Sequence, residues 1–181
     1  MLRFVSLIVA VLFLVQSSDV TVASDKVIAI PKGPDLIIPA ASPLTIKSAG
    51  PYTDAEFDGK VVVSGTYYYG RDKQYPNGEF DLTFVPSSEA YAVLPYFKGY
   101  RHLEEIVISN RDDFIRTVIP QDKLAALRKK HWCYVTGKIV IWADHFSVSV
   151  ECDSPNDAMR FLSIYRAEPV QIAQSREIEG C

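Results

Sequence analysis

The stretch Lys60–Val85, KVVVSGTYYYGRDKQYPNGEFDLTFV, contains the clearest fold signal in the chain. Its first ten residues are rich in β-branched and aromatic side chains and are bounded by Gly59 and Gly70, which is typical of a strand. Residues 75–78, YPNG, predict a turn, because Pro presets the second position and Gly accepts a positive φ. Apolar and polar residues then alternate over Glu79–Val85, which indicates a half-buried strand. The stretch therefore predicts a β-hairpin.

Further elements are expected on both sides of one helix. The helix is predicted over Gln121–Lys130, because it follows a proline, places Leu124 and Leu127 on one face and ends in basic residues. The remaining predictions are a short strand over Glu105–Ser109, a further strand or its continuation over Phe114–Ile119, a loop or helical turn over Asp153–Arg160 and a last strand over Leu162–Ile172. With 12% aromatic residues and many Val and Ile, the composition favours a mainly β fold.

A second hairpin is predicted from Trp132–Ile141 and Phe146–Cys152, with residues 142–145 as its turn. Folding the chain there places Cys133 and Cys152 on neighbouring rungs and on the same inward face, so the two are expected to form a disulfide. The closed loop of about 20 residues would contribute roughly 3 kcal/mol in the chain-entropy description. Cys181 is then left free or intermolecular.

Two strands carry the same local pattern, Val63–Thr66 (VSGT) and Val135–Lys138 (VTGK), in which a glycine interrupts a strand. The predicted order of elements resembles that of the OB-fold. It consists of a hairpin, a further strand, a helix and a second hairpin, with a glycine-kinked strand before and after the helix. The resemblance covers residues 57–172. The pattern looks most like that of secreted bacterial OB-fold-like domains of unknown function. The resemblance implies a five-stranded Greek-key barrel with one helix, Gln121–Lys130, plugging one end. A small β-sandwich is the alternative fold.

The N-terminal 24 residues predict an export signal. Arg3 precedes the apolar stretch Phe4–Val15, which is too short for a spanning helix, and small polar residues follow, with cleavage expected after Ala23 or Ser24. The chain is therefore expected to be secreted or periplasmic, with no membrane anchor after cleavage. Residues 25–56 are rich in proline and predict an ordered but irregular arm, and residues 173–181 predict a polar tail.

Charge and motifs exclude several functions. The net charge is −3, and no long basic run is present, so nucleic acid is not expected as a partner. No G-x-S-x-G elbow, phosphate-binding glycine loop or paired metal-ligand spacing occurs, and no metal, cofactor or catalytic residue is assigned. We therefore expect a non-catalytic binding module for a protein, peptide or glycan. The alternative is a small exported hydrolase whose site would combine His102 or His145 with a carboxylate.

The OB-fold resemblance also implies where a ligand would bind, namely strands two and three and the loops joining strands one to two and four to five. The candidate binding residues are Tyr68 on the first strand, Arg71 and Tyr75 in the first loop, Asp81 on the second strand, and Trp142 and His145 in the second loop. Tyr75 and Trp142 are the expected aromatic anchors, because aromatic side chains carry much of the binding energy at interfaces.

Overall fold

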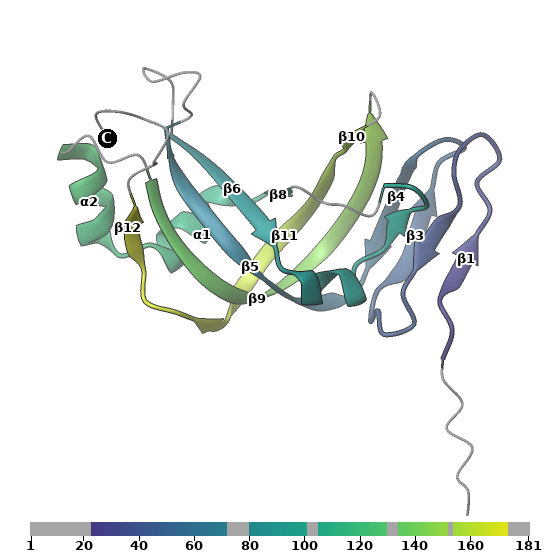
Figure 1. Ribbon diagram of the computed structural model, residues 1–181, viewed down its shortest axis with the longest axis horizontal. Coiled ribbons are helices and arrows are strands. Elements are labelled where there is room, and N and C mark those ends of the chain that lie inside the picture. The colour runs from purple at the N-terminus through teal and green to yellow at the C-terminus, as the bar shows by residue number, and fades with distance from the viewer. Residues whose placement is uncertain (1–22, 72–79, 101–104, 130–133, 152–153, 174–181) are drawn as a thin grey trace, which may run out of the picture.

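The computed structural model describes residues 23–71, 80–100, 105–129, 134–151 and 154–173 (Figure 1). It confirms the mainly β class. The strands are β1 (Lys26–Ile28), β2 (Leu36–Ile38), β3 (Thr45–Ala49), β4 (Asp54–Asp58), β5 (Lys60–Arg71), β6 (Phe80–Pro86), β7 (Tyr96–Phe97), β8 (Ile106–Ile108), β9 (Tyr134–Glu151), β10 (Ser154–Pro155), β11 (Asp157–Ala167) and β12 (Gln171–Ala173). The helices are the 3-10 turn η1 (Ser88–Ala92), α1 (Arg111–Val118) and α2 (Gln121–Lys129).

The larger sheet runs in the order β11-β8-β6-β5-β9-β4-β3, and β9 also pairs with β11. The pairings therefore lead from β5 through β6, β8, β11 and β9 back to β5. Strands β8 and β11 are parallel, whereas the other neighbours in this circuit are antiparallel. A separate sheet of β1, β2 and β7 lies beside it. Side chains from both sheets and from the helices form one hydrophobic core cluster.

The first hairpin is confirmed, with β5 and β6 paired from Gly65↔Pro86 to Arg71↔Phe80. Leu82 and Phe84 are buried, while Asp81 is exposed, as the alternation predicts. The predicted turn at 75–78 lies outside the described residues.

The two strand glycines serve close packing. A Cβ on Gly65 would lie 2.6 Å from the Phe84 ring, and one on Gly137 would lie 3.0 Å from the Tyr67 ring. The VSGT and VTGK patterns therefore mark places where a buried aromatic ring crosses the neighbouring strand. At Gly65 a side chain would occupy the space of the ring, whereas at Gly137 the ring would have to move by a few tenths of an ångström.

The predicted second hairpin is wrong. Strand β9 is continuous over Tyr134–Glu151 and curves from the end near β12 to the end near β10 (Figure 1). His145 has φ 49° within this strand, and the buried face changes there from odd positions such as Ile141 to even positions such as Phe146. An extra residue in a strand produces this change of phase, as in a β-bulge, so the sequence pattern does not require a turn.

The disulfide prediction depended on that hairpin. Cys133 and Cys152 lie outside the described residues, as does Cys181, so the pairing itself stays a prediction. The described residues next to the pair, Tyr134 and Glu151, begin and end the same 18-residue strand. The hairpin from which the bond was inferred is therefore absent from the described residues.

The helical region contains two helices where one was expected. Helix α2 begins at Gln121 as predicted, with Leu127 buried and Leu124 packed against the core. Residues 114–119, interpreted as a strand, belong mostly to α1, which buries Phe114, Ile115 and Val118. The Phe114 ring lies edge-on to Tyr67 at 5.5 Å and to Phe161 at 5.2 Å. Helix α1 therefore covers the core that the prediction assigned to α2.

The ends of the domain also differ from expectation. Residues 25–56, predicted as an ordered but irregular arm, contain β1, β2, β3 and the first residues of β4. Leu36, Ile38 and Leu44 of this segment are buried in the common core. The last long strand, β11, begins at Asp157, inside the predicted loop Asp153–Arg160, and β12 follows it. Short strand β8 confirms the strand predicted at Glu105–Ser109.

Candidate functional site

One outward-facing surface on β5 and β9 contains two of the predicted binding residues, Tyr68 and Trp142. The two strands pair over eleven rungs, from Lys60↔Asp144 to Gly70↔Tyr134. Odd-numbered residues of both strands, such as Val63 and Ile141, are buried along this stretch, so the even-numbered residues face outward. The outward residues are Val62, Ser64, Thr66 and Tyr68 on β5, and Tyr134, Thr136, Lys138, Val140 and Trp142 on β9. We call this set the β5/β9 face.

Three predicted residues meet at one end of this face. Tyr68, Arg71 and Asp81 line a cleft of about 290 Å³ together with Gly70, Thr83 and Tyr134. The Asp81 carboxylate accepts a hydrogen bond from Arg111 of α1 at 3.3 Å. The hairpin register places them together, because Gly70 pairs with Asp81 and Tyr68 with Thr83. Tyr75 lies outside the described residues.

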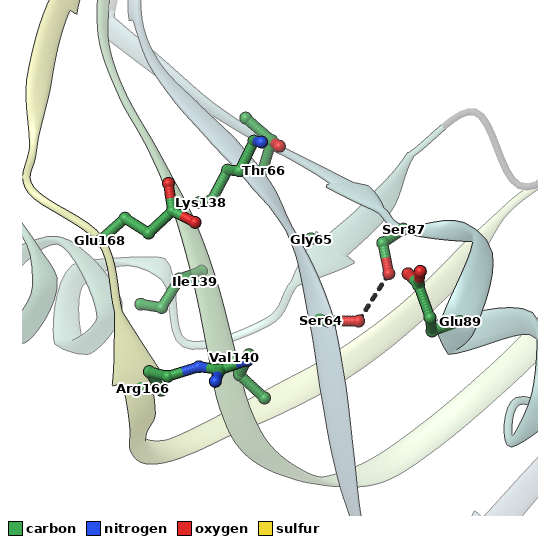
Figure 2. Close-up of a pocket in the computed structure, with 10 residues that line it drawn as sticks. All are labelled: Ser64, Gly65, Thr66, Ser87, Glu89, Lys138, Ile139, Val140, Arg166 and Glu168. Atoms are coloured by element: carbon green, nitrogen blue, oxygen red, sulfur yellow. Dashed lines mark hydrogen bonds between the residues drawn. The ribbon is translucent and has the colours of Figure 1, made fainter.

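A second cleft occupies the middle of the face (Figure 2). Its volume is about 280 Å³, and it is lined by Ser64, Gly65, Thr66, Ser87, Glu89, Lys138, Ile139, Val140, Arg166 and Glu168. Strands β5 and β9 form its floor, η1 supplies Glu89 on one side, and the end of β11 supplies Arg166 on the other. The cleft is open and its lining is mixed polar and apolar, which suits a ligand lying across the sheet.

The polar groups on one side of this central cleft form a short chain of hydrogen bonds. The Ser64 and Ser87 hydroxyl oxygens are 2.5 Å apart, and the Ser87 amide donates to the Ser64 carbonyl at 2.9 Å. The Ser87 hydroxyl donates to Glu89 and is the main reason that the pKa of this carboxyl lies below its usual range. Since a hydroxyl has a single proton to donate, Ser64 is then the donor to Ser87.

The charges on the other side have no such partners. Within the residues that the structure describes, the side chains of Lys138, Arg166 and Glu168 make no hydrogen bond or ion pair. The backbone amide of Glu168 donates to the Lys138 carbonyl at 3.0 Å, which keeps these two residues side by side. Their charged ends are therefore available to a ligand in the cleft.

An aromatic pair stands at each end of the face. Tyr68 lies edge-on to Tyr134 at 5.5 Å, and Trp142 lies edge-on to Tyr165 of β11 at 6.2 Å. Tyr68 is 37% exposed, Trp142 36% and Tyr165 63%. Exposed aromatic side chains beside polar groups are typical of binding surfaces, because the ring supplies contact area with few rotatable bonds.

His145 belongs to a different group, on the far side of the bend in β9. Its Nδ1 lies 3.0 Å from Oδ1 of Asp144, and Asp144 accepts two hydrogen bonds of 2.8 Å from Arg160. The Arg160 guanidinium is the main reason that the pKa of the Asp144 carboxyl is lowered. His145 is also part of the lining of a small cleft of about 160 Å³ with Lys47, Glu56, Phe57, Asp58, Phe146 and Ser147.

The structure thus gathers Tyr68, Arg71 and Asp81, places Trp142 on the same face, and separates His145 from them. Trp142 and His145 lie inside a strand and not in the predicted loop. Sequence reasoning missed Tyr134, Tyr165 and Arg166. The alternation of buried and outward residues along β9 could have identified Tyr134, because Tyr134 and Trp142 are both even-numbered and so face the same side of the strand.

Within the described residues, no helix is long and apolar enough to span a membrane, and no three His, Cys, Asp or Glu side chains converge as a metal site. Comparisons of the chain with protein families, with curated proteins and with solved structures give no match.

Proposed function

We propose that this protein is an exported, non-catalytic binding module whose ligand lies along the β5/β9 face. The observation that supports this most is the pairing of two exposed aromatic clusters with the central cleft between them. Unpartnered charged side chains line that cleft, and such groups fix the orientation of a ligand held by aromatic contacts. Export rests on the N-terminal sequence, with secretion or a periplasmic location as its consequence.

We also propose that the circuit β5-β6-β8-β11-β9 is an OB-type barrel. Its support is the order of the pairings, with one parallel contact between β8 and β11 and the helices between β8 and β9. In this interpretation the ligand surface lies on the first and fourth barrel strands. It differs from the surface of strands two and three that the resemblance implies, because the larger aromatic side chains lie on β5 and β9.

A capture experiment tests the binding module. The full-length chain, expressed with its own N-terminal segment, is immobilised and exposed to envelope and culture-medium fractions. Replacing both Tyr68 and Trp142 by Ala should reduce the captured material at least tenfold, since buried aromatic anchors each contribute about 2 kcal/mol. The matched control is Tyr52→Ala, because Tyr52 is 54% exposed but lies in the turn between β3 and β4.

The melting temperature should be nearly unchanged in both variants. Equal capture by the wild type, the double variant and the Tyr52→Ala variant would contradict the proposed surface.

A hydrolase is the second candidate, favoured by the geometry of His145. A histidine held by a carboxylate on Nδ1 is oriented as a general base requires, and His145 has a positive φ, which often accompanies functional sites. The described residues show no hydrogen bond from a serine hydroxyl to His145, so a nucleophile is not assembled.

The two candidates are distinguished by assaying chromogenic esters and phosphate esters. A binding module should show no turnover above the uncatalysed rate, and His145→Gln should leave ligand capture unchanged. Turnover that is lost in both His145→Gln and Asp144→Asn, with melting temperatures preserved, would instead establish the enzyme.

A further inference from the structure

We propose that the ligand of the β5/β9 face is a linear glycan without net charge, lying from the Tyr68–Tyr134 pair across the central cleft to the Trp142–Tyr165 pair. This inference rests on the proposed function and adds the chemical class of the ligand. It follows from the backbone pairing, the charge balance, the aromatic geometry and the length of the face.

The backbone of the face offers little open edge to a peptide. Strand β9 has partners on both sides over most of this stretch, with β5 from Tyr134 to Asp144, β12 from Tyr134 to Thr136 and β11 from Ile139 onward. Strand β5 is paired with β9 from Lys60 to Gly70 and with β6 from Gly65 to Arg71, so among the described pairings residues 60–63 lack a second strand partner. A bound peptide strand gains most of its affinity from main-chain hydrogen bonds to an open sheet edge. Over most of this face only side chains are available, so recognition relies on rings and polar side-chain groups.

The charges of the face are balanced. The two clefts together are lined by the cations Arg71, Lys138 and Arg166 and by the anions Asp81, Glu89 and Glu168. A polyanion such as a nucleic acid would meet as many carboxylates as cations, and its affinity depends on neutralising phosphates. A neutral ligand with many hydroxyl groups can donate to the carboxylates and accept from the cations at the same time.

The aromatic pairs suit sugar rings. In an edge-to-face pair, the ring that points its edge at its partner keeps both of its own faces clear of that partner, and the faces carry the negative part of the quadrupole. The C–H groups on one side of a sugar ring carry partial positive charge and can lie against such a face. Hydroxyl groups at the rim of the sugar then reach Ser64, Thr66 and Lys138 in the cleft between the pairs.

The length of the face requires an extended ligand. Tyr134 and Trp142 are eight residues apart on β9, which is roughly 26 Å along a strand that rises about 3.3 Å per residue. A disaccharide can contact one aromatic pair, whereas a hexasaccharide can reach both. Affinity should therefore rise steeply with chain length, because the second contact is intramolecular once the first is made.

The test uses Trp142 as its own reporter. The chain has two tryptophans, Trp132 and Trp142, so the variant Trp132→Phe leaves Trp142 as its single tryptophan, which can be excited selectively over tyrosine. The full-length Trp132→Phe protein is titrated with β-1,4-linked N-acetylglucosamine and glucose oligomers of two and six units. Hexagalacturonate, oligo-dT and casein serve as the anionic, nucleic-acid and protein probes.

At least one neutral hexamer should change the Trp142 fluorescence and bind at least tenfold more tightly than its dimer. Tyr68→Ala should weaken that binding at least tenfold, and Tyr52→Ala should not change it. The assignment of a neutral glycan would be overturned if no neutral hexamer changed the fluorescence. If casein, hexagalacturonate or oligo-dT then bound, and Tyr68→Ala weakened that binding, the proposed face would remain in place. The Trp142→Ala variant lacks the reporter, so its binding is measured by calorimetry. Hexamers that bind the Tyr68→Ala and Trp142→Ala variants as tightly as the wild type would overturn the face as well.

Discussion

Replacing Asp157 by Asn should raise the free energy of unfolding at pH 9 by about 1–3 kcal/mol relative to the wild type, and should not raise it at pH 4. Asp157 is 1% exposed at the start of β11, and its carboxylate oxygens have no hydrogen-bond partner among the described residues. Burial raises the pKa of this carboxyl to about 8. The amide of Ser149 opposes the rise only weakly, because it already donates to the Asn156 carbonyl at 3.3 Å.

The direction follows from proton linkage. An unfolded aspartate titrates near pH 3.8, so between about pH 4 and pH 8 the folded chain holds a proton that the unfolded chain has released. Wild-type stability is therefore fully retained below about pH 4 and falls as the pH rises through about 8. The upper bound is about 5 kcal/mol for a shift of about four pKa units, and relaxation around the carboxylate reduces it to the order of 4 kcal/mol.

Urea unfolding at pH 4, 7 and 9 measures this effect. The Asn variant should show a flatter dependence on pH, and at pH 4 it should be less stable than the wild type by the cost of a buried amide, about 1–3 kcal/mol. Glu105→Gln is the matched control, because Glu105 is exposed and directly precedes β8, whose Ile106 pairs with Asp157. Parallel pH curves for the wild type and the Asp157→Asn variant would show that the carboxyl is solvated or paired.

The second large effect is expected at the strand glycines, with Gly65→Ala costing about 3 kcal/mol and Gly137→Ala about 1 kcal/mol. A Cβ at Gly65 would lie 2.5 Å from the Val85 carbonyl oxygen and 2.6 Å from the Phe84 ring, and that ring is fully buried. Backbone and core must therefore both shift. At Gly137 the nearest atoms, 3.0–3.2 Å away, belong to the Tyr67 ring, which needs to move by only a few tenths of an ångström.

Thermal unfolding distinguishes the two sites. For a domain of this size, 3 kcal/mol corresponds to a fall of roughly 10 °C in melting temperature, and 1 kcal/mol to about 3 °C. The two variants are matched controls for one another, since both replace a buried glycine of an inner strand with the same residue. Equal losses at both positions would mean that strand propensity, and not the contact with the ring, determines the cost.

Local sequence signals determined the parts of the fold that depend on neighbouring residues. The β5–β6 hairpin follows from strand alternation joined by turn residues, and its register brings Tyr68, Arg71 and Asp81 together without reference to the rest of the chain. The start of α2 at Gln121 is also local, because a proline precedes it.

The bend of β9 shows where local signals are insufficient. A hairpin turn and a β-bulge both change which residues face the core, so the shift between Ile141 and Phe146 is the same in either case. Pairing decides between them. Strand β5 pairs with β9 as far as Asp144, and β4 pairs beyond the bend from Ser147, so the strand continues because both halves have partners.

The sequence by itself thus determined the β class, the first hairpin and the outward side of β5. Tertiary structure alone decided that Trp142 meets Tyr165, that Arg166 and Glu168 enter the central cleft, and that Asp157 is buried. Each of these depends on how β11 packs against β9 and β8, with a register that shifts three times along its pairing with β9. Such shifts arise from the fit of side chains across strands, which the order of residues along one strand does not encode.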